Sequence, residues 1–327
     1  MQEISIVPTM KDRINDDAIW CITFELAWNE LQSKILENKF ECNEKNEIIN
    51  NLMLSTKGKD CLSEDDYYKA VGRATNKLKE KIKTDLYKKF NENSDIIDEL
   101  KFYDDENTDN LLIYTMLKKL FSFEYEFEEL GKSTFGKNSE VVDFFGISEN
   151  NEEIEKYRQQ VEVLFYNSKL DYAIIIHTDK KENLIFYRTD ENKIFEETFD
   201  EIIDKTKRNI NYSLKKTDTI KIPNIMLKIK KEYKELENKI FVRESDRKPF
   251  IITKAMQNID FELDKKGGKV KSEAAIEMRE GCIFGGKIEK EEPRQFNFDD
   301  SFYLYLVEEK AERPYLAMKI NDIKKFI

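Results

Sequence analysis

The chain has 327 residues, a net charge of −11, and a composition that is 40% hydrophobic and 37% charged. This hydrophobic content excludes a disordered or fibrous chain. The acidic excess disfavours a nucleic-acid partner, because phosphates repel negative charge. The sequence contains no run of about 18 apolar residues, so no membrane span is predicted.

Two helices are predicted in the first third of the chain. Within residues 18–35, Trp20, Phe24 and Trp28 recur at the spacing of one helical face. Ser63 and Asp66 have the spacing of a capping box. Apolar residues then recur every three or four positions from Tyr67 to Phe90, which predicts a second amphipathic helix.

Strands are predicted in the rest of the chain. Residues 111–127 are rich in β-forming residues and alternate in their second half. Residues 161–166 and 170–178 predict a hairpin, and the unbroken apolar run in 173–176 indicates a strand with both faces buried. A helix is expected at 195–208, and strands at 222–230, 250–263, 302–307 and 314–320. Helices followed by strands favour an α+β fold.

Catalytic and metal-binding residues are scarce. The four cysteines are Cys21, Cys42, Cys61 and Cys282, and their spacing fits neither a zinc site nor a disulfide framework. We expect no metal, no cofactor and reduced thiols. His177 is the one histidine, at the end of a predicted strand. Cys21 lies on the buried face of the first predicted helix, where a cysteine is usually a small hydrophobe. A thiol enzyme using Cys21 and His177 therefore remains only a distant alternative.

The segment 264–295 is long for a connection between two strands, and long connections in compact domains tend to be functional. Its middle alternates, with Ser272, Ala274, Ile276 and Met278 on one side. That pattern is typical of a half-buried strand. The segment is either an edge strand or a loop that becomes a strand in another state.

At this point the order of segments resembles the serpins, protease inhibitors that insert their own bait loop into a sheet. ITFELAWNEL (22–31) resembles their buried opening helix, VEVLFYNSKLDYAIIIHT (161–178) their central hairpin, and FNFDDSFYLYLV (296–307) and PYLAMKIND (314–322) their closing strands. Ser272, Glu273, Ala274 and Ala275 match the hinge motif TEAA. The likeness spans most of the chain and identifies a divergent, prokaryotic-type member.

The resemblance implies one serpin-like α+β domain over residues 1–327, with a large central mixed β-sheet, further sheets, N-terminal helices and an exposed reactive loop at about 264–295. It also implies that residues 111–127 form a central strand of that large sheet. The function that it implies is that of a protease inhibitor and not an enzyme. The partner would be a serine or cysteine protease, and the protein a cytoplasmic monomer, or a secreted one if a signal peptide has been removed. A non-inhibitory binding or structural module is the alternative.

The resemblance also suggests site residues. The hinge is Ser272–Ala275 in sequence order, and the bait bond lies among Phe284, Gly285, Lys287 and Lys290. Ala18, Cys21, Thr115 and Phe123 are expected where the sheet must open. If the loop inserts, its inward set contains one charged residue, Glu280, which would have to be neutral or paired when buried.

Overall fold

The largest element of the computed structural model is a seven-stranded sheet in the order β1-β2-β20-β19-β11-β10-β9. The described residues are 4–55, 61–94, 96–108, 110–137, 139–149, 151–180, 182–209, 212–268 and 293–327. The strands are β1 (Ser5–Val7), β2 (Ala18–Cys21), β9 (Val161–Ser168), β10 (Asp171–His177), β11 (Glu182–Arg188), β19 (Phe302–Glu308) and β20 (Leu316–Ile320). Neighbouring strands are antiparallel except β1 and β2. The sheet is therefore mixed, as expected from the sequence.

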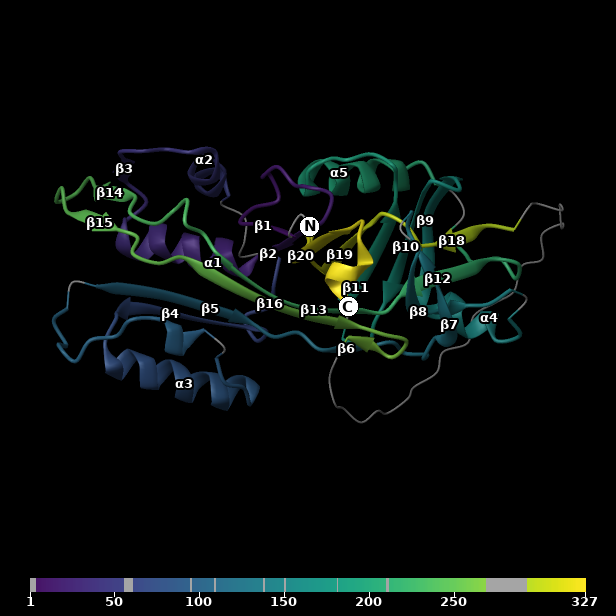
Figure 1. Cartoon of the computed structure of the whole chain (residues 1–327), viewed down its shortest axis with the longest axis horizontal. Helices are drawn as coiled ribbons and strands as arrows, with labels where there is room; N and C mark the ends of the chain where they lie inside the picture. The colour runs from purple at the N-terminus through teal and green to yellow at the C-terminus, as the bar shows by residue number, and fades with distance from the viewer. Residues whose placement is uncertain are drawn as a thin grey trace.

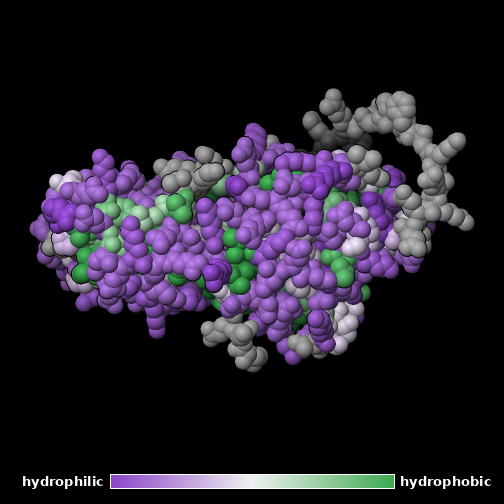
Figure 2. Space-filling view, turned by 90° about the horizontal axis from the view of Figure 1, so that it is seen from above, coloured by the Kyte–Doolittle hydropathy of each residue, from purple (hydrophilic) through white to green (hydrophobic). Residues whose placement is uncertain are grey.

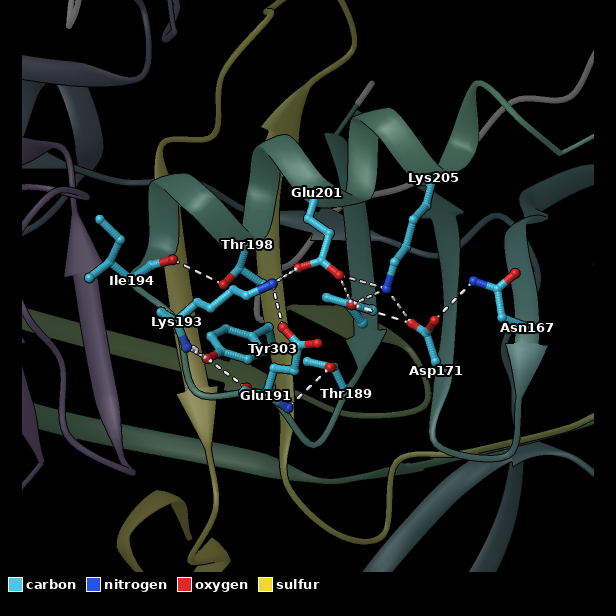
Figure 3. A network of polar contacts seen from close by, with 11 residues as sticks. Asn167, Asp171, Thr189, Glu191, Lys193, Ile194, Thr198, Glu201, Lys205 and Tyr303 are labelled. Carbon is cyan, nitrogen blue, oxygen red and sulfur yellow. Dashed lines mark hydrogen bonds and ion pairs between the residues drawn. The ribbon is translucent and has the colours of Figure 1, made fainter.

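Helix α5 (Phe195–Thr206) packs on this sheet. The Phe199 ring lies 5.2 Å from that of Tyr305 on β19. A polar network at the same interface joins Lys205 Nζ to Asp171 at 2.7 Å and to Glu201 at 2.6 Å (Figure 3). Apolar packing and ion pairs together fix α5 to the sheet.

Two smaller sheets lie at opposite ends of the molecule (Figure 1). One has the order β18-β12-β8-β7 and the other β15-β14-β3. Their strands are β18 (Gln295–Asn297), β12 (Thr219–Pro223), β8 (Glu140–Ile147), β7 (Glu128–Phe135), β15 (Pro249–Ile251), β14 (Ile240–Arg243) and β3 (Phe40–Cys42). The helices nearest to them in sequence are α2 (Glu47–Leu54) and α4 (Ile154–Gln160). Hydrophilic residues cover most of the face seen in Figure 2, with smaller hydrophobic areas towards the end that carries β14 and β15.

Three strand pairs complete the described architecture: β4 (Tyr67–Arg73) with β5 (Leu111–Leu117), β13 (Ile225–Glu232) with β16 (Met256–Leu263), and β6 (Phe121–Ser122) with β17 (Gly267–Gly268). Helix α1 (Thr23–Glu30) continues as a π-helix (Leu31–Ile35). Figure 1 shows α1 and α3 (Asn76–Phe90) on opposite sides of β4 and β5. Among the described residues, one 3₁₀ turn, η3 (Ile97–Glu99), lies between α3 and β5, and another, η4 (Ile323–Phe326), follows β20.

Several predicted elements are confirmed. The hairpin of β9 and β10, the helix α5, and the strands β19 and β20 lie where the sequence predicts them. The α+β class with a large mixed sheet is also confirmed. Within the described residues, no helix combines the length and apolar character that a membrane crossing requires.

The predicted helix at 18–35 is wrong in its first turn. Ala18 and Cys21 lie on strand β2, which pairs with β20, and the helix begins at Thr23. All four residues of β2 are buried. A fully buried strand shows no alternation, so the sequence could not separate it from the helix that follows.

The predicted helix after Ser63 is wrong over its first third. Tyr67 and Val71 belong to β4, and α3 is capped by Thr75, whose hydroxyl accepts a hydrogen bond from Leu78 N at 3.2 Å. A spacing of four places two residues on the same face of a helix and also of a strand. Pairing with β5 along the whole length of β4 decided between the two.

The expectation of one central strand at 111–127 also needs correction. β5 ends at Leu117, and the short β6 follows at Phe121. β5 is paired with β4 in a two-stranded sheet and is not part of the seven-stranded sheet. Its other edge forms one side of the cavity described next.

Candidate functional site

A large cavity in the described structure is a slot between β5 and β16. Its volume is about 1850 Å³, and every residue of both strands lines it. Among the described residues, β5 pairs only with β4 and β16 only with β13. The backbone edges that face the slot thus lack a strand partner, and such edges accept an extended segment by strand addition.

The floor of the slot is formed by α1 and the π-helix. Phe24, Trp28 and Leu31 line the cavity from below. The floor is fixed from behind by aromatic contacts, since the Trp28 ring meets that of Phe241 edge-on at 5.7 Å and the Phe24 ring lies 4.1 Å from that of Tyr233. An incoming strand would bury one face of its side chains on this apolar surface.

A buried polar network ties both edges of the slot to the start of α1. Thr115 of β5 donates from its hydroxyl to the Thr23 carbonyl at 2.8 Å. Gln257 of β16 donates to the Thr23 hydroxyl at 2.8 Å and to the Cys21 carbonyl at 3.0 Å. The Tyr233 hydroxyl donates to Gln257 at 2.7 Å. Thr23 is therefore the common anchor of β5 and β16.

The slot is closed at one end by the β6–β17 pair. Gly267 lies opposite Ser122, and Gly268 opposite Phe121. Beside this pair, Phe123 N donates to the Lys266 carbonyl at 2.9 Å. β17 directly precedes residue 269, so the chain leaves the described structure at the closed end of the slot.

The structure brings only some of the expected sheet-opening residues together. Cys21 and Thr115 line the slot and share Thr23. Phe123 is buried beside the closed end, with its ring 4.9 Å from that of Phe127. Ala18 lies apart from the slot, opposite Lys319 on β20. The sequence analysis did not identify Thr23 or Gln257. Gln257 could have been noticed, because it is the one polar residue among the buried residues of β16, which are otherwise Ile259, Phe261 and Leu263.

The other predicted site residues lie outside the described residues, which omit 269–292. They are the hinge residues Ser272, Glu273, Ala274 and Ala275 and the bait candidates Phe284, Gly285, Lys287 and Lys290. Their assignment stays a prediction from sequence.

Cys21 and His177 do not form a catalytic pair. They lie on β2 and β10, with β20, β19 and β11 between them, which corresponds to about 19 Å at the usual strand spacing. Burial raises the pKa of the Cys21 thiol, so the thiol stays protonated and weakly nucleophilic. His177 Nδ1 lies 2.7 Å from the Asn183 side-chain oxygen. In the described part of the chain, no three His, Cys, Asp or Glu side chains are placed to hold a metal ion.

Comparison with known proteins supports the fold at the level of structure only. No protein-family model and no curated protein matches the sequence. The structure of thyroxine-binding globulin in complex with thyroxine matches with a TM-score of 0.53 and 11% identity, over 94% of this chain and 93% of that one. A second structure, of the human globulin with its hormone, also has a TM-score of 0.53 and 11% identity, over 94% and 92%. Serpin48 from the insect Tenebrio molitor has a TM-score of 0.48 and 10% identity, over 91% and 95%.

The chain therefore has a serpin fold, as its match to thyroxine-binding globulin indicates. The likeness shows the fold alone and does not support the expectation of a prokaryotic type. At 11% identity the likeness shows the fold and leaves the activity to be argued from the slot.

Proposed function

We propose that this chain is a serpin-like protease inhibitor that acts as a suicide substrate for a serine or cysteine protease. The observation that carries the proposal is the slot: within the described residues, β5 and β16 have no strand partner on their inner sides, and these two edges face each other over an apolar floor. The chain that leaves β17 at Gly268 starts at one end of this slot. A strand that fills it would come from the segment after Gly268.

The inhibitor supplies no catalytic group in this mechanism. The protease attacks the bait loop with its own nucleophile and forms an acyl-enzyme. The cut loop then enters between β5 and β16 and carries the attached protease with it. Each new hydrogen bond to an edge contributes about 0.5–1.5 kcal/mol net, and burial of the inward side chains adds to that.

The chain on the two sides of the proposed loop is attached to different sheets, so the two ends can separate once the loop is cut. Upstream, the chain is attached next to the slot through β17. Downstream, Arg294 forms an ion pair with the buried Asp218 at 2.6 Å, beside β12 of a different sheet. After cleavage the downstream end can stay in its own sheet while the upstream end moves.

A protease panel tests the proposal. Incubation with serine and cysteine proteases should give an SDS-stable complex for a fraction of the molecules, with the rest cut as an ordinary substrate, because the bulky Ile276 and the acidic Glu280 are expected to slow insertion. Ala274→Arg places a charge in the predicted inward set and should abolish the complex while cleavage continues. The matched variant Glu273→Arg changes an outward position and should retain the complex. Cleavage by every protease without any complex would contradict the proposal.

A second candidate function is a non-inhibitory binding module. It is favoured by the size of the cavity and by the likeness to thyroxine-binding globulin, which was solved with thyroxine bound. The cavity of about 1850 Å³ exceeds the range of about 300–1,000 Å³ typical of small-ligand sites, which favours a strand as its occupant. A binding module would form no complex with the protease panel.

A further inference from the structure

A lysine joins the C-terminal end of β5 to the seven-stranded sheet. Lys119 follows β5 by two residues and lines the slot. Its Nζ lies 2.5 Å from Glu182 Oε1, 2.6 Å from Glu308 Oε1 and 2.7 Å from Asp66 Oδ2. These three carboxylates come from β11, β19 and the segment before β4. We name Asp66, Glu182 and Glu308 the carboxylate socket.

The carboxylate socket brings like charges close together. Glu182 and Glu308 are direct partners across the β11–β19 pair, and like charges in that position destabilise a sheet. The side chain of Glu182 is 2% exposed, so water screens this repulsion poorly. A cation between the two carboxylates removes the repulsion, and Lys119 is that cation.

The same contacts fix the β4–β5 pair at one end. Lys118 N donates to the Asp66 carbonyl at 2.9 Å, and Ser63 N donates to Glu308 at 2.8 Å. Tyr67 and Leu117, the neighbouring ends of β4 and β5, lie opposite each other. Both strands therefore meet the seven-stranded sheet through the socket, at the end of the slot that β6 and β17 close.

We propose that Lys119 is the positioning residue of the slot: seated in the carboxylate socket, it holds the β5 edge in place, and proton uptake by Glu182 releases that edge. The consequence for inhibition rests on the proposed function, since a released edge would admit the loop faster. The hold on β5 itself does not depend on inhibition.

The direction of the pH effect follows from linkage. Burial raises the pKa of Glu182, and the ion pair with Lys119 opposes that rise. The groups that face Glu182 are Lys119, Glu308, Asp66 and the Tyr315 hydroxyl. Glu182 binds a proton more tightly without Lys119 than with it, because Lys119 lowers the pKa of this carboxyl. Protons must then favour release of Lys119, so the anchor weakens as the pH falls.

Hydrogen exchange of the intact, uncut protein tests this anchor. At pH 7, the amides of residues 111–117 should exchange about tenfold faster in Lys119→Met and in Glu182→Gln than in the wild type. Residues 219–223 of β12, which belongs to a different sheet, serve as the internal reference and should be unchanged. Lys119→Arg should behave as the wild type, as should the control Lys228→Met, which removes an exposed lysine from β13 on the other side of the slot.

The pH profile separates a switch from a plain structural contact. Comparing variants at one pH cancels the intrinsic pH dependence of exchange. The difference between the wild type and Glu182→Gln should shrink as the pH falls from 7 to 5, because burial raises the pKa of Glu182 and its protonated form, like glutamine, carries no charge. Equal exchange in Lys119→Met and wild type, faster exchange in all segments alike, or an unchanged difference at pH 5 would each overturn the inference. A failed protease panel with the predicted exchange pattern would instead remove the inhibitor function and leave the anchor.

Discussion

Thr23 holds both edges of the slot, and Gln257 is the side chain that makes the hydrogen bonds on the β16 side. Its amide donates to Thr23 and Cys21 and accepts from Tyr233, and the residue is buried. Gln257→Leu leaves these partners without hydrogen bonds and should lower the free energy of unfolding by about 2–4 kcal/mol. Thr115→Val, which removes one bond, should cost about 1 kcal/mol.

Urea unfolding followed by fluorescence measures both changes. Asp260→Asn is the matched control, because Asp260 is an exposed residue on the same strand, and it should stay within about 0.5 kcal/mol of the wild type. If Gln257→Leu unfolded at the wild-type midpoint, the network would not anchor β16.

Glu25 gives the molecule a pH-dependent stability. Burial raises the pKa of this carboxyl from 4.5 to about 8, and Trp20 Nε1 donates to it at 2.8 Å. The folded state thus keeps a proton that the unfolded chain loses above pH 4.5. The free energy of unfolding should therefore fall by up to about 1.4 kcal/mol per pH unit between pH 4.5 and 8, and level off above that.

Glu25→Gln should remove most of this slope and be more stable than the wild type at pH 8, because glutamine keeps an acceptor for Trp20 and carries no charge. Thermal melting across the pH range measures it. Glu47→Gln, at an exposed position on α2, is the control and should keep the wild-type slope. A wild-type slope in Glu25→Gln would show that another group, such as the buried Asp12, causes it.

At the scale of elements, the closed end of the slot depends on two glycines. A Cβ on Gly268 would lie 2.6 Å from the Phe121 ring, and one on Gly267 would lie 2.6 Å from the Phe121 carbonyl oxygen, at a φ of +123°. Gly268→Ala should therefore separate β17 from β6. The expected result is faster hydrogen exchange in residues 121–123 with the seven-stranded sheet unchanged.

Gly72→Ala is the matched control for this substitution. Its Cβ would meet only the Leu78 side chain at 3.5 Å, an ordinary contact. Exchange in residues 121–123 should then match the wild type. Unchanged exchange in Gly268→Ala would mean that Phe121 moves aside and that the pair does not close the slot.

The elements predicted correctly are those that carry a second signal besides burial. The β9–β10 hairpin has its turn residues and a buried core strand, and α5 has one clear apolar face. β2 and β4 were assigned to helices because full burial or a spacing of four suits both structures. The slot could not be predicted at this level, since its two edges are distant in sequence and the Gln257–Thr23 contact spans 234 residues.

Across the whole molecule, strand pairing and core packing are unevenly distributed. Figure 1 shows the seven-stranded sheet with α5 on one side of the molecule and the strands of the slot extending to the other. The sheet has paired inner strands and a core of fully buried residues such as Phe186 and Leu304. At the slot, β5 and β16 each have one strand partner among the residues that the structure describes, and they lie beside a large cavity. Such a structure can gain stability by adding one strand, which an evenly packed fold cannot do.

A melting curve before and after cleavage of the loop tests this property. If the cut loop fills the slot, the new strand hydrogen bonds and the buried apolar face should raise the melting midpoint by about 10 °C or more. Glu280→Ala should raise the midpoint of the cut form further, because the predicted inward position no longer buries a carboxyl. The uncut forms of the two proteins should melt alike. An unchanged midpoint after cleavage would show that the loop does not enter the slot, and the binding-module function would then be the better account of this fold.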